Sequence, residues 1–168
     1  YSPDPATVFL PLKIKQPTES CPTRLVHSAS CPRCGSEVEE SAKACASCTF
    51  SLSTCEAMFP FEAPPLALIV DPSHVLPPGI EKHLARPHRA LRKRIPQVEI
   101  CFCFVQLERG YSVEEFAFWL LNTAPGAKKS RPWNLLVTVD LVSEQLTLTS
   151  GYALEPFLIH EAWEASLQ

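Results

Sequence analysis

The 168-residue chain lacks the long hydrophobic run that a membrane-spanning helix requires. About 20 consecutive apolar residues are needed to cross a bilayer, and the longest comparable run, residues 65–70 (PLALIV), has only the length of a strand. We therefore expect no transmembrane segment in this chain. The sequence begins at Tyr1 rather than at methionine, so we expect that an upstream segment was cleaved, trimmed or left out, and this segment could hold a signal peptide or an anchor.

Positive charge is not in excess either. Lys and Arg number 15 against 18 Asp and Glu, which gives a formal net charge of −3. Such a chain has no global basic field, so we expect no nucleic-acid partner. Hydrophobic residues make up 46% of the sequence and charged residues 20%, as in folded globular domains.

Familiar catalytic motifs are also missing. The sequence has no G-x-S-x-G nucleophile turn, no Ser-His-Asp order and no glycine-rich loop of the kind that binds phosphates. His74, His83 and His88 lack a carboxylate at metal-ligand spacing, so we assign none of them as a ligand. No motif in the sequence therefore indicates a particular reaction.

Cysteine, by contrast, is abundant, with eight residues. Four of them form two C-x2-C hooks separated by ten residues: Cys31, Cys34, Cys45 and Cys48. Two such hooks supply the four thiolates of a tetrahedral zinc site, and a four-cysteine zinc has no open position for a substrate. Gly35 follows the first hook, where the tight turn favours a positive φ. We predict a structural zinc ribbon.

Two alternatives to zinc are a redox-active cysteine pair and an iron site of the rubredoxin type. Rubredoxins usually separate their hooks by a longer insert, which favours zinc here. The acidic residues Glu37, Glu39 and Glu40 outnumber the basic Arg33 and Lys43. The ribbon is therefore expected to bind protein or to stabilise a small fold, rather than to bind nucleic acid.

The other four cysteines need a separate explanation. Cys101 and Cys103 are two residues apart in an apolar strand, so both should point to the same face as buried thiols. Cys21 and Cys55 flank the ribbon, and the sequence leaves open whether they form a disulfide. It also leaves open whether the compartment is reducing or oxidising, because bound metal protects thiolates.

Composition divides the chain into four segments. Residues 1–30 are expected to be an extended N-terminal arm with an edge strand near residues 7–15, since Pro11 cannot donate to a ladder. Residues 31–55 are the predicted zinc ribbon, and 56–65 a proline-rich linker. Residues 66–168 are expected to form the main domain.

In the main domain, apolar patterns predict strands at 66–70, 98–107, 133–140 and 144–150. Helices are predicted at about 78–95, from Ser112 as a capping box, and from Pro156 onwards, and Pro87 should break or kink the first of them. The order β-α-β-α-β-β-α predicts an α/β fold, a three-layer α/β/α sandwich with a mixed sheet, because the last two strands form a hairpin.

Several of these segments resemble the TPM-domain family, whose members include thylakoid acid phosphatases linked to photosystem II repair. The resembling runs are IVDPSHVL at 69–76, SVEEFA at 112–117, LLVTVD at 135–140 and GYALE at 151–155. The resemblance covers about residues 66–168 and implies a Rossmann-like fold. It also implies one of two functions, either accessory subunits of membrane-associated complexes or divalent-metal-dependent acid phosphatases.

The resemblance also implies candidate site residues. Asp71 and Asp140 match the acids that follow the first and third strands, and they are the candidate catalytic residues. With Asn134 and Glu155 they would be the remnant of a site for calcium or another divalent ion.

This chain departs from the family in the loop before the third strand. Family members have oxygen ligands there, whereas this chain has Lys128, Lys129 and Arg131, which could instead bind an anion. Ala153 replaces a motif glycine, and the chain ends at Gln168, where family members continue with further helix.

A basic stretch on the predicted helix at 78–95 contains Arg86, Arg89, Arg92 and Lys93. It offers a surface for anionic lipid or for an acidic partner. We therefore expect a membrane-associated, non-catalytic accessory protein with protein partners, and the alternative is a metal-dependent phosphatase.

Overall fold

The computed structural model describes residues 28–39, 42–125, 133–151 and 153–154. Nine elements follow one another within them: β1 (Ser28–Ser30), β2 (Glu37–Glu39), α1 (Leu52–Met58), β3 (Ile69–Val70), α2 (Ile80–Arg94), β4 (Glu99–Val105), α3 (Val113–Thr123), β5 (Asn134–Asp140) and β6 (Gln145–Ser150). The edge strand expected near residues 7–15 and the helix expected from Pro156 lie outside the described residues.

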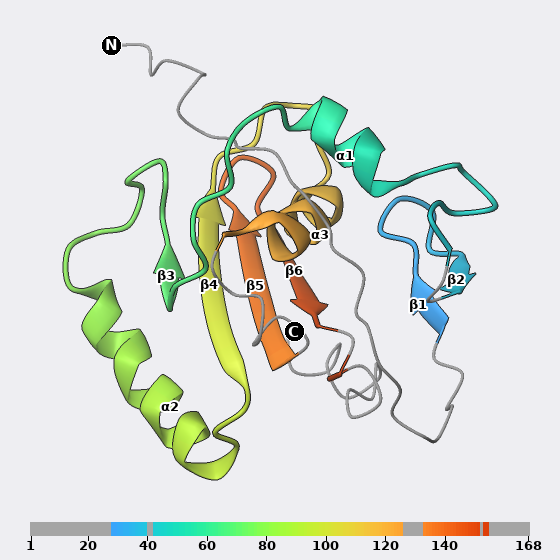
Figure 1. The fold of residues 1–168 in the computed structure, drawn as a ribbon. Coiled ribbons are helices and arrows are strands. Elements are labelled where there is room, and N and C mark those ends of the chain that lie inside the picture. The colour runs from blue at the N-terminus through green and yellow to red at the C-terminus, as the bar shows by residue number, and fades with distance from the viewer. Residues whose placement is uncertain (1–27, 40–41, 126–132, 152, 155–168) are drawn as a thin grey trace.

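The centre of the fold is a four-stranded sheet in the order β3-β4-β5-β6 (Figure 1). Strands β3, β4 and β5 are parallel, and β6 returns antiparallel to β5. Helices α2 and α3 connect the parallel strands, as parallel connections require. The predicted α/β class and the mixed sheet with its terminal hairpin are confirmed.

One face of the sheet carries the buried core. Because side chains alternate along a strand, Cys101, Cys103 and Val105 of β4 share a face with their register partners on β5. All three are buried, and so are the partners Leu136 and Thr138. The prediction that Cys101 and Cys103 point into one face as buried thiols is therefore confirmed.

Helix α3 covers this face, and its start follows the sequence signal. The Ser112 side chain accepts a hydrogen bond from the backbone N–H of Glu115 at 3.3 Å, which is half of the predicted capping box. Phe116 and Trp119 are fully buried and pack around Phe59, with ring centroids 5.4–5.5 Å apart. This aromatic cluster fixes α3 to the segment that precedes the sheet.

Helix α2 lies beside β3 and contains no fully buried residue (Figure 1). It continues through Pro87 from Ile80 to Arg94, so of the expected break or kink the break is wrong, and the kink stays a prediction. Proline removes the hydrogen bond to the carbonyl of His83. Both residues are exposed, so water can take the place of that bond.

The first strand of the sheet is shorter than predicted. Only Ile69 and Val70 pair with β4, whereas the apolar pattern predicted a buried strand from Leu66. Leu66 and Leu68 are half-buried and Ala67 is exposed. The Leu68 carbonyl still accepts a hydrogen bond from Phe102 N–H of β4 at 2.9 Å, so the apolar segment meets β4 one residue before the assigned strand begins.

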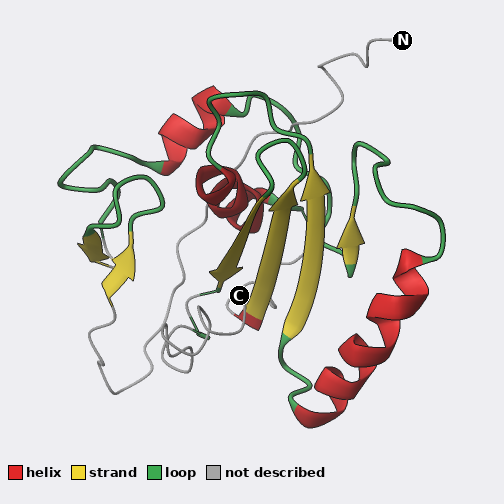
Figure 2. Ribbon diagram, turned by 180° about the vertical axis from the view of Figure 1, so that it is seen from behind, coloured by secondary structure: helices red, strands yellow, loops and turns green. Residues whose placement is uncertain are grey.

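Helix α1 joins the cysteine-rich N-terminal part to the α/β part (Figure 2). Cys31, Cys45 and Phe50 belong to the same buried cluster as Trp119 and Leu120. Phe50 contacts Phe118 of α3 at a centroid distance of 5.6 Å. Among the described residues, no helix is both long and apolar enough to cross a membrane.

Candidate functional site: a four-cysteine centre and two strand-end carboxylates

The two cysteine hooks sit in two hairpin turns with the same backbone hydrogen bonds. In the first, Gly35 N–H donates to the Cys31 carbonyl at 2.9 Å and Cys31 N–H donates to the Ser36 carbonyl at 2.8 Å. In the second, Thr49 and Cys45 make the equivalent bonds, both at 2.8 Å. The turns are closed by the β1–β2 pairing and by an Ala44–Ser51 bridge.

These turns bring the four sulfurs together. All four Sγ atoms lie within 4.8 Å of one another, with 3.6 Å between Cys31 and Cys48 and between Cys34 and Cys45. With Zn–S bonds of about 2.3 Å, a tetrahedral site separates its sulfurs by about 3.8 Å. The four cysteines therefore form a cluster that can hold a metal ion, at the positions the sequence predicted.

The electrostatics of the cluster also favour a cation. The Ser36 hydroxyl beside Cys34, together with backbone hydrogen bonding, lowers the pKa of the Cys34 thiol to about 6. A backbone hydrogen bond at Phe50 favours the Cys48 thiolate, but desolvation and the three neighbouring sulfurs outweigh it and raise the pKa of Cys48 to about 12. Four thiolates at this spacing therefore need a cation in order to ionise together.

Arg33, inside the first hook, connects this centre to α3. Its Nε donates to Glu115 Oε1 at 2.6 Å and its Nη2 lies 3.3 Å from Oε2, a two-pronged pair with a carboxylate that is only 6% exposed. The guanidinium also stacks over the Phe50 ring, 4.8 Å from its centroid. The hydrogen bond with Glu115 raises the pKa of Arg33.

Sequence reasoning missed this contact. It assigned Glu115 to the capping box and counted Arg33 only as one of two basic residues in the ribbon. The signal that could have found it was an arginine between the two cysteines of the first hook, together with a glutamate on the apolar side of the start of α3, where Val113 and Phe116 are buried as well. Helix α1 was missed as well, although Ser51 caps it by accepting from Thr54 N–H.

Cys55 lies on α1 as a free, fully buried thiol near the Glu115 carbonyl, with an S–O distance of 4.0 Å. Burial raises the pKa of the Cys55 thiol to about 12. Cys21, its candidate disulfide partner, lies outside the described residues. Cys55 is thus part of the core beneath the ribbon.

Asp71 follows β3 and closes the loop that comes after it. Its two carboxylate oxygens accept hydrogen bonds from the backbone N–H groups of Val75 and Leu76, both at 2.9 Å. His74, inside this loop, adopts a positive φ of 52°. The carboxylate therefore holds a tight turn together.

Asp140 ends β5, and its carboxylate accepts hydrogen bonds from two loops. It accepts from Leu107 N–H at 3.0 Å, from Val142 N–H at 3.1 Å, and from the backbone and hydroxyl of Ser143. Burial opposes ionisation, but the Ser143 hydroxyl and the three backbone donors outweigh it and lower the pKa of Asp140. Asp140 is 2% exposed. Its carboxylate holds the loop between β4 and α3, which contains Leu107, against the β5–β6 turn.

The structure does not bring the candidate ion ligands together. Asn134 begins β5 and Asp140 ends it, so six strand steps, roughly 20 Å, separate them. Among the described residues, only the four cysteines form a group of metal-ligating side chains close enough to share an ion. Glu155 and the candidate anion-binding residues Lys128, Lys129 and Arg131 lie outside the described residues.

The basic stretch lies on α2, where Arg86, Arg89 and Lys93 are exposed. Arg92 differs, because its Nη2 pairs with Glu99 Oε1 on β4 at 3.3 Å. Lys82, one helical turn before Arg86, extends the exposed basic stripe in its place.

Comparison with known proteins adds no family assignment. No protein-family model matches this chain, and no curated protein matches it significantly.

Proposed function

We propose that this chain is a non-catalytic interaction protein, an accessory subunit or assembly factor of a larger, membrane-associated complex. The observation that carries this proposal is the state of the two strand-end carboxylates. Both oxygens of Asp71 accept hydrogen bonds from the loop that follows it, and Asp140 accepts hydrogen bonds from two loops. Asn134, the other candidate ligand among the described residues, lies at the far end of β5 from Asp140. In this chain the two carboxylates therefore hold loops together, which supports a structural role for both.

The metal of the four-cysteine centre is proposed to be a structural zinc ion. Four thiolates satisfy the preferred coordination of Zn²⁺ and leave no position for a substrate, so the ion would supply folding energy. The packing of the hooks against α3 supports this role, because the ligands Cys31 and Cys45 are buried within the common core.

Two surfaces support an interaction role. The sheet face opposite α3 carries Phe102, Phe104, Val137 and Val139, all half-buried, and Leu146, which is 44% exposed. Such an apolar face suits a protein partner. The stripe of Lys82, Arg86, Arg89 and Lys93 on α2 is proposed to meet anionic lipid headgroups.

We also propose that the fold is a three-layer sandwich of the Rossmann-like TPM type. The order β3-α2-β4-α3-β5-β6 and the hairpin β5–β6 support this proposal. The buried Leu154, which follows the Gly151 turn, supports it as well.

Hydrolysis of a generic aryl phosphate tests the non-catalytic role. We expect no turnover above background with Mg²⁺, Ca²⁺, Mn²⁺ or Zn²⁺ over an acidic to neutral pH range. Metal-dependent turnover that Asp71→Asn abolishes and the exposed Glu108→Gln leaves intact would instead establish the phosphatase alternative.

Flotation with vesicles tests the membrane surface separately. The chain should float with phosphatidylserine-containing vesicles at low salt and less at high salt, since such contacts are screened. Replacing Lys82, Arg86, Arg89 and Lys93 by glutamine should abolish flotation, whereas Arg109→Gln, an exposed arginine outside α2, should not. Equal flotation of all three proteins would remove α2 from the proposal.

A further inference from the structure

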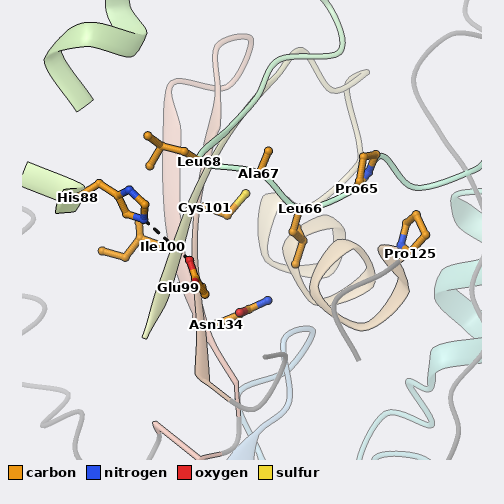
Figure 3. Close-up of a pocket in the computed structure, with 10 residues that line it drawn as sticks. All are labelled: Pro65, Leu66, Ala67, Leu68, His88, Glu99, Ile100, Cys101, Pro125 and Asn134. Atoms are coloured by element: carbon orange, nitrogen blue, oxygen red, sulfur yellow. Dashed lines mark ion pairs between the residues drawn. The ribbon is translucent and has the colours of Figure 1, made fainter. Parts of the chain in front are cut away.

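A pocket of about 390 Å³ lies at the amino ends of β4 and β5, away from the cysteine centre (Figure 3). Residues 65–68 form one side of it, and His88 reaches it from α2. Pro125, directly after the C-cap residue of α3, forms another part of the wall. The pocket therefore gathers side chains from three parts of the fold that are far apart in sequence.

Two polar side chains stand next to each other in this pocket. Glu99 and Asn134 are register partners at the start of the β4–β5 ladder, so their side chains lie side by side on the same face. Asn134 is 3% exposed, yet its Oδ1 accepts no hydrogen bond from any residue that the structure describes. A buried acceptor without a partner is rare in folded proteins and costs stability.

The charges around the pair favour a cation. One carboxylate oxygen of Glu99 forms an ion pair with Arg92. Its other oxygen lies 3.9 Å from His88 Nε2, which is too far for a hydrogen bond. The nearby C-terminus of α3, which attracts positive charge, has no basic residue in its last turn. None of the described residues that line the pocket is lysine or arginine.

The remaining walls are apolar. Leu66, Leu68, Ile100 and Pro125 line the pocket beside the polar pair. Cys101 also lines it, and burial raises the pKa of its thiol to about 12, so the thiol is neutral near pH 7. A ligand that fits this lining carries its charge at one end and an apolar stem at the other.

We propose that this pocket binds a primary ammonium group on a short alkyl stem. The ammonium would donate to the unpartnered Asn134 Oδ1 and to the Glu99 carboxylate, and the stem would lie against the leucine and proline side chains. A bare metal ion fits less well, because no group of three His, Cys, Asp or Glu side chains from the described residues converges at this pocket. An anion is disfavoured by the carboxylate and by the helix C-terminus.

The test is a protein-observed NMR titration with n-butylammonium, with n-butanol and butyrate as probes of the same length. We expect butylammonium to shift the amides of β4 and β5 next to the pocket, with butanol much weaker and butyrate silent. Equal shifts with all three probes, or none with butylammonium, would overturn the proposal.

Two variants separate recognition from fold stability. Glu99→Gln should weaken butylammonium binding about tenfold or more, since it removes a charge-assisted hydrogen bond, whereas the exposed Glu108→Gln should not. Arg92→Gln releases the carboxylate from its ion pair and should tighten binding severalfold. A loss of binding in Arg92→Gln equal to that in Glu99→Gln would mean that Glu99 only anchors α2, and would contradict the proposal.

The same ammonium could come from a free amine or from a lysine side chain of a partner. A capped lysine, Nα-acetyl-lysine methylamide, distinguishes these sources because it has the same four-carbon stem. Binding at least as tight as butylammonium would identify a partner's lysine as the ligand. Exclusion of the capped lysine would identify a small free amine.

Discussion

At the scale of single residues, the turns that carry the two cysteine hooks differ at one equivalent position. Gly35 in the first turn has a φ of +72°, and Thr49 in the second has a φ of +59°. Glycine adopts this conformation freely, whereas a β-branched residue is strained there. The second hook thus folds against a local strain that the first hook avoids.

Substitutions at these two positions should have opposite effects on stability. Thr49→Gly should raise the free energy of unfolding by about 1 kcal/mol, because left-handed strain of about 1–2 kcal/mol is partly offset by glycine's entropy. Gly35→Ala should lower it by about 1 kcal/mol, since an added Cβ meets no atom within 4 Å and only the backbone conformation costs energy. Urea unfolding of the metal-loaded protein measures both; a destabilised Thr49→Gly would contradict this reading.

Asp140 should make the fold sensitive to acid. Its folded pKa is lowered, so the stability it provides is complete above its unfolded pKa of about 3.9 and is lost as pH falls through the folded pKa. At pH 7, Asp140→Asn should cost about 1–3 kcal/mol, because backbone donors lose a charged acceptor. This cost should shrink below pH 4, whereas the exposed Glu144→Gln should show no such trend. A pH-independent cost, measured by urea unfolding, would refute this role.

At the scale of elements, the ion pair between Arg33 in the first hook and Glu115 on α3 is the main polar link, among the described residues, between the cysteine centre and the α/β part. Glu115 is nearly buried, whereas the side chain of Arg33 is 35% exposed, so solvent screens part of the attraction. The pair orients α3 relative to the metal centre, and Phe50 packs between them.

A double-mutant cycle should measure this link. Arg33→Ala should cost about 2 kcal/mol, because Glu115 is left buried without its partner, and the coupling with Glu115→Gln should be about 1–2 kcal/mol. Arg33→Lys should retain part of the coupling, since it keeps the charge but loses the two-pronged geometry. Additive costs in urea unfolding would show that the pair contributes nothing.

The sequence predicted most of the sheet because its signals are local. The apolar runs around Cys101 and Leu136 gave strands β4 and β5 to within two residues, and Ser112 marked the start of α3. The cluster of four cysteines that can hold a metal ion followed from spacing alone. These features depend on neighbours within a few positions along the chain.

The features that sequence reasoning missed depend on distant contacts. Leu66 was assigned to a strand, but only tertiary pairing decides where β3 begins. Pro87 was expected to break α2, but solvent exposure lets the helix continue. Arg33 and Glu115 are 82 residues apart, so no local pattern pairs them.

At the scale of the whole molecule, the cysteine centre and the α/β part share one hydrophobic cluster. That cluster runs from Cys31 and Cys45 through Phe59 to Leu136 on β5. Metal binding contributes folding energy to the ligands that it holds. A shared core should transmit that energy to α3 and the sheet, so that metal loss loosens more than the ribbon.

Metal content should respond to one ligand. The purified chain is expected to carry one equivalent of zinc by elemental analysis, and Cys31→Ser should lose it, whereas the equally buried but non-ligating Cys103→Ser should retain it. Iron in place of zinc, or no metal at all, would contradict the assignment.

Hydrogen exchange of the α3 amides, compared with and without a zinc chelator, shows whether a structural metal centre is built into the core of this domain. We expect chelation to speed amide exchange in residues 113–123 and in the two cysteine hooks together, because these segments unfold as one unit. If the metal leaves and the hooks exchange freely while α3 keeps its protection, the centre is an independent appendage. That result would contradict a metal centre built into the core.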